Sequence, residues 1–234
     1  MSESQQAGSA ADLAQLQEDV GELSAIRAVA LDIGGVMLSW AYGKYRRHYS
    51  DWPPALMDAA WEKRLGLEPG EFARRVWAAP SHAQATAGVI PFEEYWPGVA
   101  EELGLTSEAL AELWEDYWVI SRLDPDIEAA LRELRPRYRV AALSNAFSNA
   151  RAEVTRRFGL DQLVDLMVIS GEVGLAKPDP RIYQLLLSEL EMQAHEVLFV
   201  DDVEVNVAAA RSVGMRATLS TSESSFLRVL DYLR

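Results

Sequence analysis

Six polar residues stand out because each follows an apolar run of the kind that forms a buried strand. They are Asp32, Ser144, Asn145, Lys177, Asp201 and Asp202. In open parallel sheets the ligand crevice lies at the carboxyl ends of the strands, so residues that follow different strands can meet at one edge. Carboxylates are hard oxygen ligands of the kind that Mg²⁺ prefers, and a lysine and a hydroxyl can hold the oxygens of an anion. The pattern therefore predicts a shared site.

Each of these residues also has a purely structural explanation when it is taken alone. Asp32 could accept hydrogen bonds from loop amides, and Asp202 with Asn206 one turn later could form a helix N-cap. The adjacent carboxylates of Asp201 and Asp202 repel each other unless a cation or strong donors compensate them. A shared site is favoured because it explains all six residues together.

The elements that must position these residues are indicated by the apolar runs. Near-continuous apolar runs that alternate with helical patterns are typical of a parallel sheet covered on both faces. The runs are Val29 to Ile33, Val140 to Leu143, Leu166 to Ile169, Val197 to Val200 and Met215 to Leu219. Helices are expected at 126–135, 148–158, 180–190 and 204–213, with Gly159 and Gly214 as stop signals. These features predict an α/β fold with a Rossmann-like parallel sheet core.

More than 100 residues separate the first run from the second, which is too many for one crossover helix. Helical patterns lie near 54–65, 69–78, 91–103 and 107–121. All seven tryptophans fall in this interval: Trp40, Trp52, Trp61, Trp77, Trp96, Trp114 and Trp118. We therefore expect an inserted helical cap domain with its own aromatic core at 44–121, and an α/β core at 25–43 and 122–234.

Residues 1–24 form an acidic extension that contains five acids and neither lysine nor arginine. Apolar residues recur in it at helical spacing, namely Leu13, Leu16, Val20 and Leu23. This spacing indicates an amphipathic helix that docks on the body of the protein or on a second subunit.

Composition excludes several functional classes. The chain has 234 residues, of which 49% are hydrophobic, and its charges sum to 22 − 36 = −14. This net charge argues against a general nucleic-acid binder. The absence of cysteine excludes a thiolate nucleophile and a disulfide framework. Because the sequence has neither a signal peptide nor a membrane-spanning run, we expect a cytoplasmic protein, monomeric or homodimeric, that acts without a membrane.

Four motifs resemble those of the haloacid dehalogenase (HAD) superfamily of hydrolases, and they occur in the family's order. They are DIGGV with Asp32, ALSNAF with Ser144 and Asn145, GLAKPDP with Lys177, and FVDDVEVN with Asp201, Asp202 and Asn206. Together with the insertion after the first motif, they are similar to the helical-cap phosphatase branch. This branch includes the phosphatase domain of soluble epoxide hydrolase and bacterial sugar-phosphate phosphatases.

The resemblance implies a phosphatase that acts on small phosphorylated metabolites. Asp32 would be the nucleophile and would form an aspartyl phosphate that water then hydrolyses. Lys177 would hold Asp32 and the transferring phosphoryl group. Ser144 and the backbone N–H groups after it would bind the phosphoryl oxygens, with Asn145 also at the substrate.

The same resemblance implies a Mg²⁺ site, because a phosphate ester is a dianion that a carboxylate cannot approach without positive charge nearby. Asp32, Asp202 and the backbone carbonyl of Gly34 would supply oxygen ligands. Asp201 would lie behind Asp202 and reach the ion through water.

The sequence departs from the family pattern at Gly34, where most phosphatases of the superfamily carry an acid/base aspartate. Such a group is typically worth about 10² to 10⁴ in rate. The enzyme could use substrates whose leaving group needs little protonation, such as sugar 1-phosphates. A cap residue could replace the aspartate, with His48 the candidate in the basic stretch 44–48. As the alternative, the chain is a non-catalytic or weakly active binding protein.

Hydrolysis of a C–P or C–halogen bond remains a minor alternative. Dehalogenases of the superfamily usually carry tyrosine in place of Gly34 and need no Mg²⁺, whereas the pair Asp201-Asp202 argues for a metal. Phosphonoacetaldehyde hydrolase relies on a cap lysine that forms a Schiff base. The only cap lysines, Lys44 and Lys63, have no clearly desolvated setting in the sequence.

Overall fold

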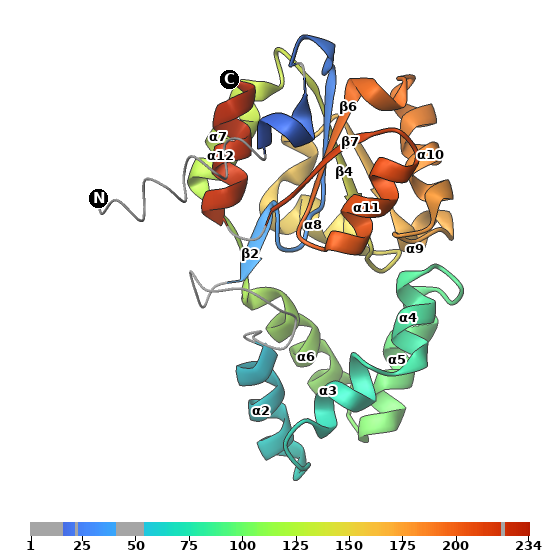
Figure 1. Cartoon of the computed structure of the whole chain (residues 1–234). Helices are drawn as coiled ribbons and strands as arrows, with labels where there is room; N and C mark the ends of the chain where they lie inside the picture. The colour runs from blue at the N-terminus through green and yellow to red at the C-terminus, as the bar shows by residue number, and fades with distance from the viewer. Residues whose placement is uncertain (1–15, 22, 41–53, 221–222) are drawn as a thin grey trace.

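A five-stranded parallel sheet forms the centre of the molecule, with the strand order β5-β4-β1-β6-β7 (Figure 1). The structure is a computed structural model, and it describes residues 16–21, 23–40, 54–220 and 223–234. The strands are β1 (Ala28–Leu31), β4 (Arg139–Ser144), β5 (Leu166–Ile169), β6 (Val197–Asp201) and β7 (Arg216–Leu219). Each neighbouring pair is parallel. The expected α/β fold is confirmed.

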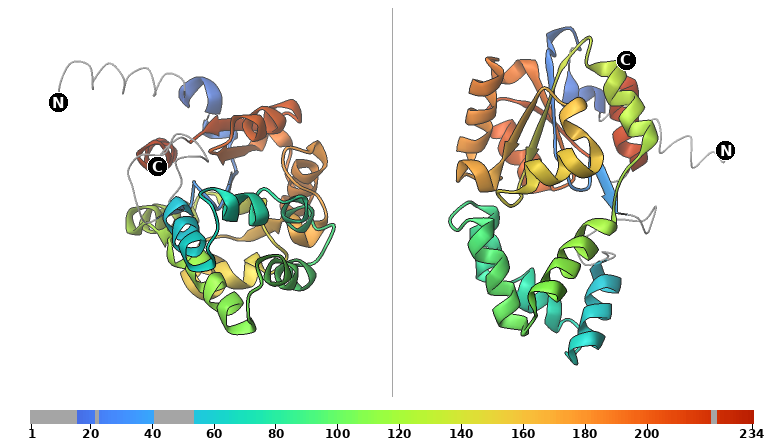
Figure 2. Two further views of the ribbon diagram at one scale, coloured as in Figure 1. Left: turned by 90° about the horizontal axis from the view of Figure 1, so that it is seen from below. Right: turned by 180° about the vertical axis from the view of Figure 1, so that it is seen from behind.

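The sheet is covered by helices on both faces, as Figure 2 shows from behind. The side chains of β1 alternate between the two faces, because successive residues of a strand point to opposite sides. Val29 and Leu31 pack in the cluster of α7, α8 and α12, whereas Ala28 and Ala30 pack in the cluster of α10 and α11. These helices are α7 (Pro125–Leu134), α8 (Ala150–Phe158), α10 (Pro180–Leu190), α11 (Glu204–Ser212) and α12 (Glu223–Leu233).

Several short elements have no counterpart among the sequence expectations. An antiparallel hairpin pairs β2 (Leu38–Trp40) with β3 (Ser121–Leu123). The other short elements are α4 (Pro80–Thr86), α9 (Ser170–Val173), η1 (Leu23–Ala25), η3 (Leu160–Gln162) and η4 (Ala194–Glu196). Helix α12 was also not expected. In the described part of the chain, no helix combines the length and apolar character that a bilayer crossing requires.

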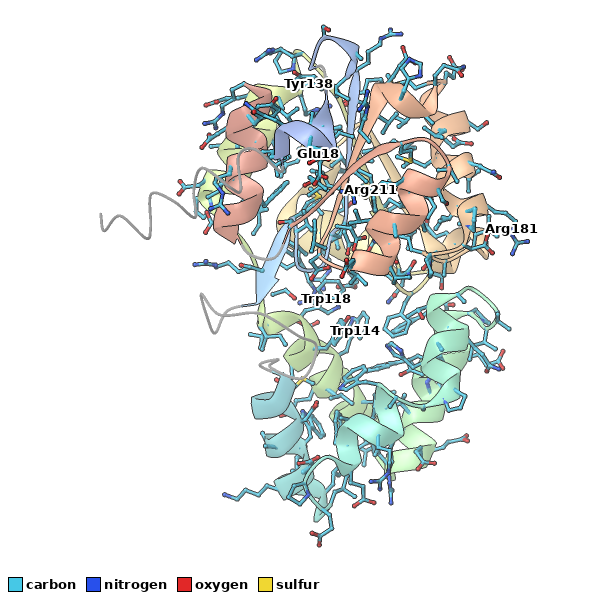
Figure 3. All side chains as sticks on the ribbon, in the orientation of Figure 1. Glu18, Trp114, Trp118, Tyr138, Arg181 and Arg211 are labelled. Carbon is cyan, nitrogen blue, oxygen red and sulfur yellow. The ribbon has the colours of Figure 1, made fainter. Side chains whose placement is uncertain are left out.

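Residues 54–119, called here the helical insert, lie between the two strands of the hairpin (Figure 1). The helices are α2 (Pro54–Leu65), α3 (Glu71–Val76), α4, α5 (Phe92–Leu103) and α6 (Ser107–Val119). They share a hydrophobic cluster that includes the buried Trp61 and Trp96. Trp118 differs, because it packs in the cluster of α7, α8 and α12. Figure 3 shows Trp114 and Trp118 on α6, where the insert meets the core.

The described part of the N-terminal extension docks on the body of the protein. Residues 16–20 are helical, and Leu16 and Val20 are buried in the cluster that covers one face of the sheet. Asp19 forms an ion pair with Arg211 at 2.7 Å and accepts a hydrogen bond from Thr218 at 2.9 Å. Leu13 and the side chain of Leu23 lie outside the described residues.

Two buried acids on α2 hold both ends of α3. Glu62 accepts a hydrogen bond from the backbone N–H of Phe72 at 3.2 Å, and Asp58 accepts one from Trp77 Nε1 at 3.1 Å. Burial raises the pKa of Asp58 to about 6, the Trp77 hydrogen bond opposes the shift, and the charge of Glu62 adds to it. The folded chain therefore binds a proton at Asp58 that the unfolded chain has already released between about pH 4 and pH 6.

This difference predicts how Asp58→Asn changes stability. Because the folded-state pKa is raised, ionisation of Asp58 costs stability as the pH rises through this range, and the cost persists above it. Asparagine keeps the acceptor for Trp77 without a charge, so the variant should melt roughly 2–4 °C higher than the wild type at pH 8. At pH 4 the two proteins should melt at nearly the same temperature, as measured by circular dichroism. An equal difference at both pH values would contradict the assignment.

Candidate active site

The three central strands bring their polar ends to one edge of the sheet. Asp32 follows β1, Ser144 ends β4 and Asp201 ends β6. Because β1 pairs in parallel with both β4 and β6, these ends are neighbours, and the Asp32 N–H donates to Val200 O at 2.9 Å. The meeting of these residues at one sheet edge was predicted from the sequence.

Lys177 enters this edge from the loop after α9 and is buried between two carboxylates. Its Nζ lies 2.6 Å from Asp201 Oδ2 and 3.1 Å from Asp32 Oδ1. Burial disfavours the ammonium, but the charges of Asp32 and Asp201 outweigh it and raise the pKa of Lys177. The lysine is therefore a fixed positive charge beside Asp32.

The side chain of Asn145 holds the main chain of Lys177. Asn145 Nδ2 donates to Lys177 O, and Lys177 N donates to Asn145 Oδ1, both at 2.8 Å. The sequence had placed Asn145 at the substrate. In the structure its amide instead joins the loop after β4 to the loop that carries Lys177.

Asp201 is fully buried, and donors from three residues satisfy its two oxygens. Oδ1 accepts from Val203 N at 2.8 Å and from Asn206 Nδ2 at 3.1 Å, whereas Oδ2 accepts from Lys177. Asn206 is held in turn, because its carbonyl accepts from Tyr183 OH at 2.9 Å. This arrangement orients Lys177.

The carboxylates of Asp32, Asp201 and Asp202 form a group that fits a divalent cation. One oxygen from each lies within 4.8 Å of the others. Burial raises the pKa of Asp32 to about 7, Lys177 lowers it, and the charges of Asp201 and Asp202 raise it further. When all three carboxyl groups are ionised, they exceed the one ammonium by two negative charges, which a divalent cation would neutralise.

Gly34 lies in the turn that follows Asp32, close to the carboxylate group along the chain. Its neighbour Gly35 donates to Leu38 O at 2.8 Å and has a φ of 86°, which favours glycine. Gly34 itself forms a bridge with Leu38 at the start of β2. The turn therefore presents main chain at the position where the family pattern usually has an acidic side chain.

The loop after Ser144 differs from its expected form. Ser144 is buried at the end of β4, as expected. The N–H of Ala146 donates to Ser170 Oγ at 2.9 Å, so it is not free for an anion. Phe147 then enters the aromatic cluster of the helical insert. Ser170 and Phe147 carried no signal in the sequence, because their partners are set by which loops meet in space.

The residues considered for the missing acid/base and for a Schiff base lie outside the described residues or are exposed. Stretch 44–48, which contains His48, is outside them. His82 packs edge-on against Trp77, and burial lowers its pKa to about 4, so it is neutral near pH 7. Lys63 is exposed, which disfavours it as a Schiff-base lysine.

Comparison with known proteins identifies relatives of the chain. A model of the haloacid dehalogenase-like hydrolases matches residues 26–214, which confirms the resemblance. The phosphatase MT3486 of Mycobacterium tuberculosis is 34% identical over 83% of this chain and 87% of its own length. Bifunctional epoxide hydrolase 2 of Sus scrofa is 28% identical over 88% of this chain, which spans only 38% of that protein.

A solved structure shares the fold. A HAD family enzyme from Bacteroides thetaiotaomicron, crystallised with magnesium and inorganic phosphate, superposes with a TM-score of 0.67 at 20% identity. The match covers 84% of this chain and 95% of that one. At this identity the likeness supports the fold of the chain and leaves its reaction to be argued from its own residues.

The buried charges predict the effect of Lys177→Met. Loss of the ammonium leaves Asp32 and Asp201 buried without their partner, so the free energy of unfolding should fall by about 3–5 kcal/mol in urea titrations with EDTA. The double variant with Asp201→Asn should recover part of this loss. As a control, Arg181→Met breaks an exposed pair with the same 2.6 Å separation and should change stability far less. Equal losses in the two single variants would contradict the argument.

Proposed function

The chain belongs to the haloacid dehalogenase-like hydrolases, and on that premise we propose that it is a Mg²⁺-dependent phosphatase of small phosphorylated metabolites. The observation that carries the proposal is the buried Lys177 ammonium 3.1 Å from Asp32, in a group of three carboxylates. The pairing of a nucleophile with a fixed positive charge suits transfer of an anionic group.

In the first step, an oxygen of Asp32 attacks the phosphorus of the ester. The new O–P bond forms as the bond to the leaving oxygen breaks, and the leaving group departs with its electron pair. Lys177 attracts the phosphoryl oxygens, and the hydroxyl of Ser144, the last residue of β4, donates to one of them. Asp32, Asp202 and the Gly34 carbonyl would hold a Mg²⁺ ion, which would supply further positive charge.

In the second step, water attacks the phosphorus of the aspartyl phosphate. The O–P bond to Asp32 breaks, the carboxylate is regenerated, and inorganic phosphate leaves with the oxygen from water. Asp201 keeps Lys177 in place through both steps, because its own oxygens are already held by Val203 and Asn206. Asn145 fixes the main chain of Lys177 through two hydrogen bonds.

Gly34 favours substrates whose leaving group needs little protonation. With no carboxyl at this position, the departing oxygen lacks the usual proton donor, so esters of acidic hydroxyls are favoured. Sugar 1-phosphates and acyl phosphates meet this requirement better than sugar 6-phosphates do. The relative named as a phosphatase supports hydrolysis of a phosphate ester, but its name gives no substrate.

The reaction can be tested by measuring phosphate release from a panel of esters with Mg²⁺. Asp32→Asn should lower turnover by at least about 10³-fold, because amide nitrogen and oxygen are poor nucleophiles. Removal of metal with EDTA should abolish turnover, and added Mg²⁺ should restore it. Asp126→Asn, an exposed aspartate at the start of α7, is the matched control and should keep full activity.

Absence of turnover would favour the alternative that the chain binds a ligand without hydrolysing it. If the wild type with Mg²⁺ releases no phosphate from any ester while inorganic phosphate still binds, the catalytic proposal is wrong. Turnover that survives in Asp32→Asn would place the nucleophile elsewhere.

The missing carboxyl at Gly34 should make the rate depend on the leaving group. The wild type should hydrolyse sugar 1-phosphates faster than sugar 6-phosphates, by a kcat/KM ratio of about 10-fold or more. Gly34→Asp should raise the rate for 6-phosphates and leave that for acyl phosphates nearly unchanged. Gly34→Ala tests whether a side chain alone alters the turn. Equal wild-type rates for the two sugar phosphates would remove the basis of this argument.

A further inference from the structure

Ser170, the first residue of α9, bridges the helical insert and the loop after β4. Its side chain is fully buried. Ser170 Oγ donates to the carbonyl of Thr86 at the end of α4 and accepts from Ala146 N at 2.9 Å. A hydroxyl can donate one hydrogen bond and accept others, so Ser170 bonds to the carbonyl of the insert and to the N–H of the loop at the same time.

Around this hydroxyl the main chain of α9 lies close to the loop after β4 on the core and to Gly88 of the insert. A Cβ on Gly171 would lie 2.5 Å from Ser148 N and 2.7 Å from Ala146 O. A Cβ on Gly88, which follows α4 with a φ of +72°, would lie 3.0 Å from Gly171 O. Only glycine allows this contact without movement. Figure 1 shows α4 directly beside α9, in agreement with their contacts.

The residues that follow Ala146 also bind the insert. The ring of Phe147 is buried, with its centroid 5.1 Å from that of Tyr95 and 5.3 Å from that of His82. Ser148 Oγ accepts a hydrogen bond from the backbone N–H of Phe92 at 3.2 Å. Phe147 and Ser148 are therefore held by residues of α4 and α5 of the insert.

A second contact between the insert and the core lies away from this loop. Arg157 on α8 forms an ion pair with Glu115 on α6, with one nitrogen 2.5 Å from the carboxylate. Glu115 is largely exposed, so this pair is screened by solvent. This pair does not touch residues 144–148, which the insert reaches through Ser170, Phe147 and Ser148.

We propose that Ser170 is a positioning residue that transmits docking of the helical insert to residues 144–148. This segment begins at Ser144, which binds a phosphoryl oxygen in the proposed function, on which this inference rests. With the insert docked, the Thr86 carbonyl takes the Ser170 proton. Without it, the nearest other acceptor is Ala146 O at 3.3 Å, which already accepts from Gly171 N at 3.0 Å. Undocking thus disturbs the hydrogen bonds of Ala146, next to Asn145 and the Lys177 loop.

The test compares Ser170→Ala with Gly88→Ala, which pushes the insert from Gly171 and keeps the hydroxyl. Amide hydrogen exchange is measured for residues 144–148, and inorganic phosphate with Mg²⁺ is titrated as the probe. In both variants these amides should exchange about five- to tenfold faster, and phosphate should bind correspondingly more weakly. With an ester substrate, KM should rise by a larger factor than kcat falls.

Glu115→Gln is the control, because it weakens the ion pair between the insert and Arg157 and should change neither exchange at 144–148 nor phosphate affinity. A purely structural role for Ser170 would lower the melting temperature and leave KM at 25 °C unchanged, which would overturn the inference. So would exchange within twofold of wild type in both variants. If the wild type hydrolyses no ester, the proposed function fails alone, and the exchange data still decide the role of Ser170.

Discussion

A lysine ammonium buried between two carboxylates is the interaction on which the site depends. Asp32 comes from β1, Asp201 from β6 and Lys177 from the loop after α9, so one charge joins three segments of the chain. Desolvation of each ion costs several kcal/mol, and only good geometry with further hydrogen bonds offsets this cost. Asn206 supplies such a bond to Asp201, and Asn145 fixes the lysine main chain. The parallel pairing of β1 with β6 makes the arrangement possible.

The same group of side chains carries more negative than positive charge, and this excess affects both the pKa of Asp32 and the binding of an anionic ester. One ammonium does not neutralise three carboxylates, so burial and mutual repulsion raise the pKa of Asp32 to about 7. A dianionic ester would meet a negative surface there. A single divalent cation would reduce both the repulsion among the carboxylates and the repulsion between the carboxylates and the ester. The same excess of negative charge therefore explains why the site would bind a cation and why it needs one before it can bind an anionic ligand.

The sheet and its polar edge could be predicted because they depend on local patterns. Short apolar runs define β1, β4 and β6, and the chain topology of a parallel sheet brings Asp32 and Asp201 together. The contacts made by Asn145 and Ser170 could not be predicted, since their partners lie 24 to 84 residues away along the chain. The hairpin strands have three residues each, too few to show alternation, and the sequence of α4, PSHAQAT, has no apolar period.

The antiparallel pair of Leu38–Trp40 with Ser121–Leu123 bears on how the chain assembles. Strand β1 must pair with β4, which lies more than 100 residues later, and the entropy of closing a loop grows with its length. Once the hairpin forms, the two ends of the intervening segment are one strand spacing apart, about 4.8 Å. The entropy cost of pairing β1 with β4 is then that of closing a short loop, because the hairpin has already brought the two ends of the segment together. Once the hairpin has formed, the pairing of β1 with β4 depends little on the number of residues in the helical insert.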